Sequence, residues 1–298
     1  MSVLNVLESH VILHIIEFLP DHEKIKFMST CKSLYEFRCH VTYNNFYVYD
    51  TINHLDFVNK FKKLIYLSIF NENSKNYDPT IIVKSIKDVI PPNTKCIIFD
   101  DDFDEDITEF IPEGIKYVVF GIHFNKPIKK ILPNSIIHLI LGFSFNQSIS
   151  DILPCGLIEL TLGHNFRQSI NDIPNTITKL IFDSEFIPEI HGKIPTNINC
   201  LGIRGYFGKN HKKDIPNNIK HLIIGTDYHS KMCEVIEDSI DMIITENMTH
   251  ITLGWNFDDT TFNIPNGVTH LILYQKFNPT IIKCLPSSVE HVEFISRW

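Results

Sequence analysis

The amino-acid sequence predicts a mainly β solenoid, with a parallel sheet of about ten short strands, that follows a small α-helical N-terminal module. A dipeptide of Ile or Leu followed by Pro recurs every 20 or 21 residues through most of the last two thirds of the chain. Apolar and aromatic residues keep fixed places between these dipeptides. The first 40 residues instead show apolar residues at helical spacing.

Each repeat is counted from the first residue of its Ile-Pro or Leu-Pro dipeptide. These first residues are Ile90, Ile111, Leu132, Leu153, Ile173, Ile194, Ile215, Ile264 and Leu285. A tenth repeat begins at Ile244, where Thr245 replaces the proline, so one unit carries an insertion near residues 229–243. Proline lacks an N–H donor, and we therefore expect it in a turn that enters the strand.

Apolar columns run through the repeats. Places eight and ten are apolar in every unit, and place fourteen is always aromatic, from Phe103 in the first unit to Trp298 in the last. Apolar residues two apart indicate a short strand. A unit of this size cannot offset the roughly 1 to 2 kcal/mol per residue of lost backbone entropy by itself. The units must therefore stack, with parallel strands and the aromatic columns inside.

The repeats over residues 90–298 resemble the FNIP repeat, a short variant related to the leucine-rich repeat. The segment Phe262-Asn263-Ile264-Pro265 spells the motif. This resemblance implies a curved, leucine-rich-repeat-like solenoid.

Residues 1–40 are expected to form a separate helical module, in which Pro20 closes the first helix and Asp21 caps the second. So short a segment cannot bury a sizeable core, which predicts an exposed apolar face. The segment resembles the F-box, a family that docks onto a Skp-type adaptor and thereby onto a cullin ubiquitin ligase. The adaptor-binding residues that this resemblance implies are Leu7, Val11, Ile12, Ile15, Ile16, Leu19, Pro20, Ile25 and Phe27.

The segment also departs from the F-box pattern. Glu8 stands where proline is usual, Lys24 where an aliphatic residue is expected, and Leu34 where the family often has tryptophan. A helical hairpin that only caps the solenoid would show the same apolar spacing. Between module and repeats, residues 41–89 are expected to form a linker and N-terminal cap, with a degenerate strand at Leu64, Leu67 and Ile69.

Places seven and nine flank the core residues, so their side chains point to the opposite face of the sheet. The first column is polar and varied, whereas the second is rich in Ile. The residues predicted to form a target-binding surface there are Tyr117, His138, Ile140, Glu159, Lys179, Ile181, His221, Ile223, His250, His270, Ile272 and His291. Two alternatives remain open: β-branched residues simply favour strands, or another segment covers this face.

Two clusters raise the question of metal binding. The histidines of the last four repeats share one column, but no carboxylate or thiolate joins them, which favours a pH-sensitive contact surface. The acidic run at 100–106 lacks the glycine and distal glutamate of a calcium loop, which favours a solvated loop. The inserted segment at 229–243 is either a binding element or a tolerated scar of duplication. We expect no metal and no cofactor.

Composition narrows the function further. A net charge of −8 gives no field that would attract nucleic acid, and no apolar run is long enough to cross a membrane. Seven cysteines are scattered without a CxxC pair, which indicates neither a disulfide framework nor a zinc site. No phosphate loop, nucleophile elbow or metalloprotease motif is present. We expect a soluble, non-enzymatic protein.

The two resemblances together imply a substrate-recognition adaptor of a cullin-type ubiquitin ligase, in which the F-box binds a Skp-type adaptor and the repeats bind a target protein. A repeat scaffold or decoy that binds its target without recruiting a ligase is the alternative. The expected location is the cytoplasm, with the nucleus as a second possibility and the host-cell cytoplasm if the source is viral.

Overall fold

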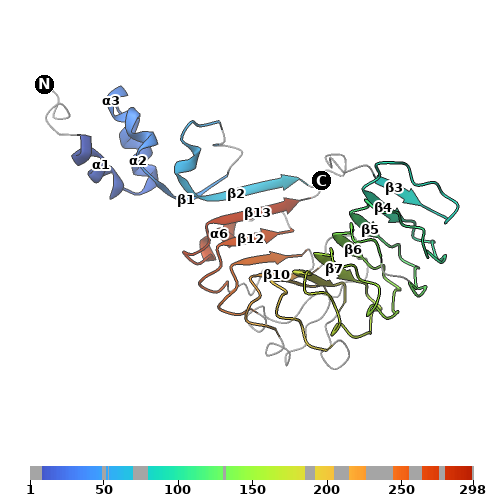
Figure 1. The fold of residues 1–298 in the computed structure, drawn as a ribbon. Coiled ribbons are helices and arrows are strands. Elements are labelled where there is room, and N and C mark those ends of the chain that lie inside the picture. Colours follow the sequence, from blue (N-terminus) through green and yellow to red (C-terminus); the bar gives the residue numbers. More distant parts are fainter. Residues whose placement is uncertain are drawn as a thin grey trace, which may run out of the picture.

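A computed structural model describes residues 9–48, 52, 54–69, 80–129, 132–184, 192–204, 215–225, 244–254, 264–274 and 279–296. Three short helices precede a long, strongly curved sheet that forms an open arc (Figure 1). No helix in this described part of the chain has the length and apolar content that crossing a membrane requires.

The sheet has 13 strands among the described residues, and every neighbouring pair is parallel. The ten strands of the repeats are β4 (Cys96–Phe99), β5 (Tyr117–Val119), β6 (His138–Ile140), β7 (Glu159–Leu162), β8 (Lys179–Phe182), β9 (Cys200–Ile203), β10 (His221–Ile224), β11 (His250–Leu253), β12 (His270–Leu273) and β13 (His291–Ser296). Each strand covers the places of its repeat at which apolar residues alternate with other residues in the sequence. The predicted parallel β solenoid is confirmed.

The strands are aligned place for place. Leu139 of β6 lies opposite Leu160 of β7, which lies opposite Leu180 of β8. The proline of the dipeptide lies in the turn before the strand, and in most repeats its carbonyl oxygen accepts a hydrogen bond from the N–H three residues later, as Pro133 does from Ile136 at 3.1 Å. The unit that begins at Ile244 keeps this turn without its proline and supplies β11.

The columns at places five, eight, ten and fourteen fill the interior of the solenoid. Phe103, Phe124, Phe145 and Phe166 are each at most 2% exposed. The rings of Phe124 and Phe145 stack with their centroids 6.0 Å apart. Fully burying such a side chain stabilises the fold by roughly 1.5 to 3 kcal/mol, which explains why the column tolerates no polar residue. The later members of this column lie outside the described residues.

A short column of glycines follows the strands of three successive repeats. A Cβ atom at Gly142 would lie 1.8 Å from the carbonyl oxygen of Gly121, and one at Gly163 would lie 1.9 Å from that of Gly142. The backbones of adjacent turns approach too closely there for any side chain. The close approach of adjacent turns therefore requires glycine at these places.

The N-terminal module contains α1 (Ser9–Glu17), α2 (Asp21–Met28), α3 (Lys32–Tyr35) and a 3-10 turn at Glu36–Cys39. It does not end at residue 40. Ile12 and Ile16 pack in one buried cluster with Tyr43, Phe57 and Phe61, separate from the core of the solenoid. The module therefore includes β1 (Tyr43–Val48), the 3-10 turn Val58–Lys60 and the start of β2 (Phe61–Ile69).

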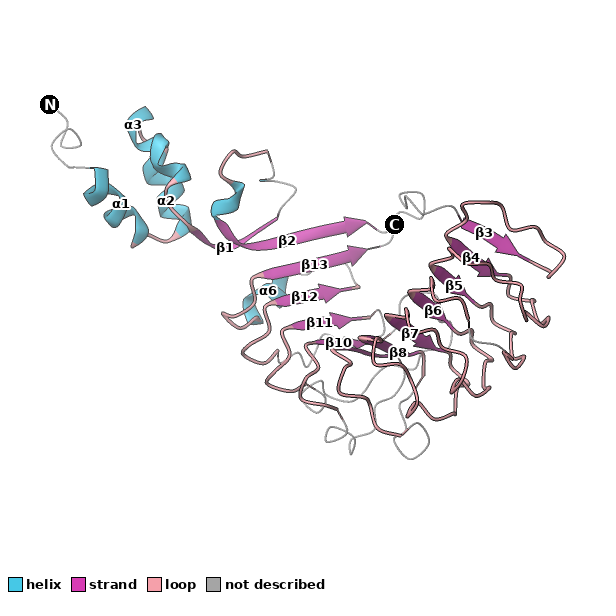
Figure 2. Cartoon of the chain, viewed as in Figure 1, coloured by secondary structure: helices cyan, strands magenta, loops and turns pink. Residues whose placement is uncertain are grey.

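Residues 41–89 were expected to cap the N-terminal end of the solenoid. Their strands instead pair with both ends of it. β3 (Thr80–Val83) pairs with β4 at the N-terminal edge. β2, which contains the predicted degenerate strand, instead pairs with β13 at the C-terminal edge, from Leu64 opposite His291 to Ile69 opposite Ser296 (Figure 2). The apolar pattern of a strand does not specify its partner, and the last strand offers the unpaired edge that β2 fills. The helices are consequently attached beside the last repeats.

Candidate protein-binding surfaces

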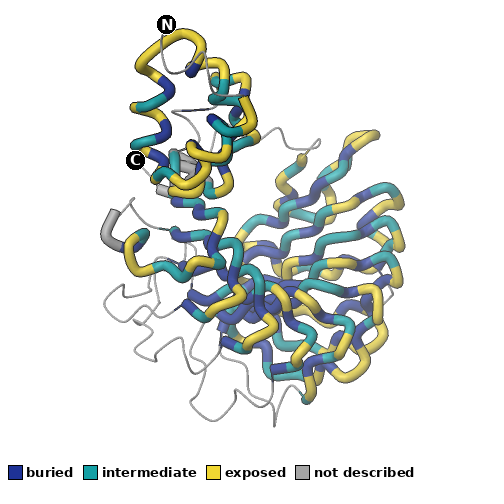
Figure 3. Tube along the Cα trace, turned by 90° about the vertical axis from the view of Figure 1, so that its left-hand side faces the viewer, coloured by how far each residue is buried: buried dark blue, intermediate teal, exposed yellow. Residues whose placement is uncertain are grey.

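Large apolar side chains are exposed at several places in the described chain, and the helical module carries four of them. Ile15, Phe18, Ile25 and Tyr35 are 46%, 77%, 44% and 50% exposed. Figure 3 shows exposed stretches along the module's helices. Monomeric proteins rarely leave so many such residues in water on so small a module, so these four residues, called the hairpin surface below, mark a candidate docking region.

The residues implied by the F-box resemblance fall into three groups. Ile12 and Ile16 are buried inside the module; Ile15, Pro20 and Ile25 are exposed. The half-buried ones are Val11, Leu19 and Phe27. Leu7 lies outside the described residues. Sequence reasoning did not include Phe18 or Tyr35, although their apolar character and helical spacing relative to Ile15 and Ile25 could have indicated them.

Lys24, the departure from the F-box pattern, is buried against Asp21. Their side chains are 2% and 3% exposed, and Nζ of Lys24 lies 3.3 Å from Oδ1 of Asp21. The same ammonium donates to the carbonyl oxygen of Thr42 at 2.8 Å. The other carboxylate oxygen of Asp21 accepts bonds from the N–H groups of Asn44 and Asn45 at 2.6 and 2.7 Å. This cluster fastens α2 to the start of β1.

The carboxylate of Asp21 also accepts a hydrogen bond from the phenol of Tyr47 at 3.3 Å. Burial and the nearby Asp21 raise the pKa of Tyr47 well above its usual range. The same two causes, in the same order, raise the pKa of Tyr43 to about 12. Both phenols therefore stay neutral at physiological pH.

A cavity of about 240 Å³ lies between the hairpin and the first two strands. Ile25, Tyr35, Tyr43 and Phe61 line it, together with Arg38. The guanidinium of Arg38 lies 4.1 Å from the ring centroid of Tyr35, which holds that ring beside the cavity. Because Ile25 and Tyr35 belong to the hairpin surface, the cavity offers a recess where a partner's apolar side chain can enter.

The face of the sheet that carries places seven and nine, opposite the core, is called the inner face below. It carries the residues predicted to bind a target. His138, Glu159 and Lys179 form a chain of contacts across β6, β7 and β8. Nδ1 of His138 lies 3.0 Å from Oε2 of Glu159, and Nζ of Lys179 lies 2.9 Å from Oε1. Tyr117 stacks on His138 with ring centroids 4.7 Å apart. Hydrogen bonds from His138 and Lys179 outweigh the burial of Glu159 and lower its pKa.

The imidazoles of the last repeats form a stacked column on the same face. The ring centroids of His250 and His270 lie 4.2 Å apart, and those of His270 and His291 lie 4.4 Å apart. His221 bonds through Nε2 to the hydroxyl of Thr252 at 2.8 Å. Burial, followed by His250 and Lys179, lowers the pKa of His221 to about 4. Burial and neighbouring imidazoles also lower the pKa values of His250 and His270.

The apolar column at place nine is exposed only in part. Ile140 is 36% exposed, and Ile223 and Ile272 are half-buried. Ile181 is 3% exposed, so its predicted place on the surface is wrong. The next repeat has Gly202 at this place, and a Cβ atom there would lie 2.9 Å from Cγ1 of Ile181. The Ile181 side chain therefore occupies the space that a residue at 202 would need.

The acidic run at 100–106 belongs to a ladder of side-chain bonds between repeats. Oδ1 of Asp104 accepts the N–H of Asn125 at 3.2 Å, and Oδ1 of Asn125 accepts the N–H of Asn146 at 2.9 Å. Oδ1 of Asn146 accepts the N–H of Arg167 at 2.8 Å. Asp104 is the first rung and also pairs with Lys126 at 3.1 Å. The recurrence of Asp and Asn at place fifteen was the sequence signal that could have revealed this ladder.

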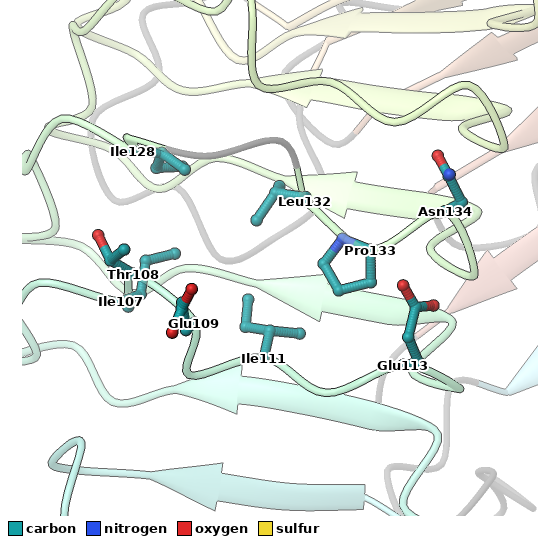
Figure 4. A pocket seen from close by; sticks show the side chains of 9 residues that line it. All are labelled: Ile107, Thr108, Glu109, Ile111, Glu113, Ile128, Leu132, Pro133 and Asn134. Carbon is teal, nitrogen blue, oxygen red and sulfur yellow. The ribbon is translucent and has the colours of Figure 1, made fainter.

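A second cavity, of about 440 Å³, lies between the second and third turns of the solenoid (Figure 4). Its floor consists of core-column residues such as Ile111 and Leu132, and Glu109 and Glu113 lie at its rim. Sequence reasoning gave no indication of it. Within the described part of the chain, no group of three or more potential ligands could hold a metal ion. The inserted segment at 229–243 lies outside the described residues.

Comparison with known families bears on the repeats directly. The FNIP Repeat family matches five overlapping or separate stretches of the chain, 84–123, 107–144, 124–165, 145–184 and 260–297. Residues 84–184 and 260–297 are thus similar to FNIP repeats. The first range covers β4 to β8, and the second covers β12 and β13, so the predicted resemblance to the FNIP repeat is confirmed over these strands.

Curated relatives come from Acanthamoeba polyphaga mimivirus. One, described as an F-box and FNIP repeat-containing protein, is 44% identical over 97 residues, 33% of this chain and 19% of its own length. Another, described as an F-box protein, is 49% identical over 55 residues, 18% of this chain and 22% of its own length. The chain thus spans about a fifth of the length of these FNIP and F-box relatives.

One solved structure is also similar to the chain. It is described as a novel circular leucine-rich-repeat protein, covers 79% of this chain and 43% of its own, and is 21% identical with a TM-score of 0.37. That score is too low to bear on the fold, which follows from the strand pairing itself.

Proposed function

We propose that this chain is a non-enzymatic substrate-recognition adaptor of a cullin-type ubiquitin ligase. The hairpin surface docks a Skp-type adaptor, and the inner face of the FNIP repeats binds the target protein. The carrying observation is the hairpin surface: Ile15, Phe18, Ile25 and Tyr35 are all 44% exposed or more within three short helices. An apolar group of this size on so small a module needs a partner.

Two further observations support the proposal. Relatives with an F-box in their descriptions align with this chain at 44% and 49% identity. On the inner face, Lys179 and Glu159 form an ion pair with Nζ 2.9 Å from Oε1. Charged groups that are paired in this way suit a contact surface better than acid–base chemistry. Because the relatives are viral, the proposed place of action is the cytoplasm of a host cell.

The experiment measures the affinity of the full chain for a purified Skp-type adaptor of an amoebal host by biolayer interferometry. Replacing both Ile15 and Ile25 by Glu puts charges on the exposed face, and we expect binding at least about tenfold weaker. Ile16 is unsuitable as a target because it is fully buried, so a charge there would unfold the module.

The matched control is Lys26→Glu, an exposed change on the same helix as Ile25. It should leave the affinity within about twofold of the original value, because surface charges contribute little. Equal binding by the original chain and the double variant would refute the docking proposal.

A second candidate function is a repeat scaffold or decoy that binds a target without ligase recruitment. The observation that favours it is the burial of Lys24 with Asp21, where the F-box pattern has an aliphatic residue. In this case the original chain itself would fail to bind the purified adaptor at micromolar concentrations, while the inner face would still bind its target.

A further inference from the structure

Large apolar side chains are also exposed at the N-terminal edge of the sheet. Ile82 of β3 is 59% exposed, and Ile86 and Val89, in the segment that follows, are 43% and 82% exposed. Along place nine, the residues next to Ile82 in the sheet, Ile98 and Val119, are only half exposed. Ile82 differs from them because it has a neighbouring strand on one side only among the described residues.

Among the described residues, no strand pairs with the backbone of Ile82 on its outer side. In the inner repeats, the carbonyl oxygen at place nine accepts the N–H at place ten of the preceding repeat: Ile140 from Phe120, and Thr161 from Leu141, both at 2.9 Å. Ile82 occupies this place in β3. No strand of the described chain lies before β3, so its N–H and C=O face outward from the sheet.

Hydrogen bonds fix the conformation of the chain at the end of β3. Oδ2 of Asp88 accepts the N–H groups of Lys84 and Ser85 at 2.7 and 3.0 Å, which fixes the chain where it leaves β3. On the other side, the carbonyl oxygen of Val83 accepts the N–H of Asp100 at 2.8 Å. A fixed edge loses little conformational entropy when it binds an additional strand.

Charge selects the kind of strand. The exposed side chains of Lys84 and Lys87 follow β3 directly. Opposite carboxylates would pair with them, and like charges would be repelled. Lysines at a sheet edge also discourage non-specific pairing, so an apolar strand without carboxylates gains less.

We propose that β3 binds an extended segment of a partner protein as an additional parallel strand, with an aliphatic side chain beside Ile82 and a carboxylate beside Lys84 and Lys87. Main-chain bonds to the edge supply affinity, and the two side-chain contacts supply selectivity. This contact lies apart from the hairpin surface and does not require adaptor docking.

The probe is a fluorescein-labelled nine-residue peptide of alternating threonine and isoleucine that ends in two glutamates, titrated into the full chain by fluorescence anisotropy. We expect saturable binding. Ile82→Pro removes the outward N–H and blocks the edge, and should weaken binding at least about tenfold. The matched control is Ile158→Thr, an exposed isoleucine directly before the paired inner strand β7, which should leave binding unchanged.

Two further arms keep the proposal testable if Ile82→Pro disturbs folding. In the probe peptide, alternate backbone nitrogens point toward β3. Methylating these nitrogens should abolish binding, whereas methylating the nitrogens that point away from β3 should not. Lys84→Glu combined with Lys87→Glu should weaken binding about fivefold at low salt and less at high salt.

Three results would overturn the inference. They are no saturable binding by the original chain, equal binding by Ile82→Pro and the original chain, and a concentration-dependent dimer in sedimentation that Ile82→Pro abolishes. The last would identify a second copy of this chain as the occupant of the edge. None of these outcomes alters the affinity for a Skp-type adaptor, so the two proposals fail separately.

Discussion

Thr245 stands where the other nine repeats have proline, and its buried hydroxyl oxygen has no hydrogen-bond partner among the described residues. The turn itself is unchanged, because the carbonyl oxygen of Thr245 accepts the N–H of Met248 at 3.2 Å, as Pro216 does from Ile219. A hydroxyl buried without a partner costs stability, and threonine leaves the unfolded chain freer than proline does.

We therefore predict that Thr245→Pro stabilises the protein by about 1 kcal/mol. Urea denaturation followed by circular dichroism measures the change. Thr245→Val is the control, because it removes the hydroxyl and keeps the backbone N–H; its stability should lie between those of the other two proteins. A loss of stability in Thr245→Pro would show that this turn differs from those of the other repeats.

The imidazole column predicts a dependence of stability on pH. The pKa of His221 is about 4 in the folded protein and near 6.5 when exposed. Between these values the unfolded state binds more protons, so stability is fully present above about pH 6.5 and falls as the pH falls toward 4. At pH 5 the loss from this residue is about 2 kcal/mol.

Urea denaturation at pH 8 and pH 5 checks this prediction, with His221→Gln for comparison. At pH 8 the variant reports only the lost contact with Thr252. At pH 5 the variant should lose less stability relative to its pH 8 value than the original protein does. Parallel losses in the two proteins would mean that His221 does not carry the effect.

At the scale of elements, the sequence predicted the ten strands of the repeats because period-two apolar residues and one aromatic place recur in register. It did not predict the partner of β2. A strand's apolar pattern tells which face is buried, whereas the choice between β13 and β4 depends on where the chain returns in space.

The candidate surfaces were predicted less completely. Alternation placed the column of Tyr117, His138 and Glu159 on one face, but it could not indicate that Ile181 leans over Gly202. Helical spacing identified Ile15 and Ile25 but did not separate them from Ile16, because the packing of the module against β1 and β2 decides which side is buried. A lysine in an apolar segment gave no sign of its buried partner.

The buried Lys24–Asp21 cluster, which connects α2 to β1, leads to a prediction about the stability of α2. Lys24→Met removes the counter-charge of a buried carboxylate, and we expect a loss of about 3 to 5 kcal/mol from the module's stability. Hydrogen exchange of the α2 amides measures it. Adding Asp21→Asn to this variant should recover part of the loss, because no unpaired charge then remains.

Lys26→Met is the matched control for that experiment, since Lys26 lies exposed on the same helix. It should change the exchange of α2 by less than about 0.5 kcal/mol. If Lys24→Met were equally harmless, the Asp21 cluster would not be what fastens the helices to the sheet.

For the whole molecule, the pairing of β2 with β13 joins segments more than 200 residues apart in sequence. The hairpin surface is thereby attached to the C-terminal end of the arc, while β3 is the terminal strand at its N-terminal end among the described residues (Figure 1). The proposed sites of adaptor docking and target binding therefore lie on separate parts of the described chain: the appended helices and the continuous sheet.

Hydrogen–deuterium exchange of the full chain, with and without saturating purified Skp-type adaptor, tests this division most directly. The account predicts slower exchange in α1 and α2, with no change in the inner repeats from β4 to β12. Protection confined to the repeats, or no protection anywhere on the chain, would contradict it.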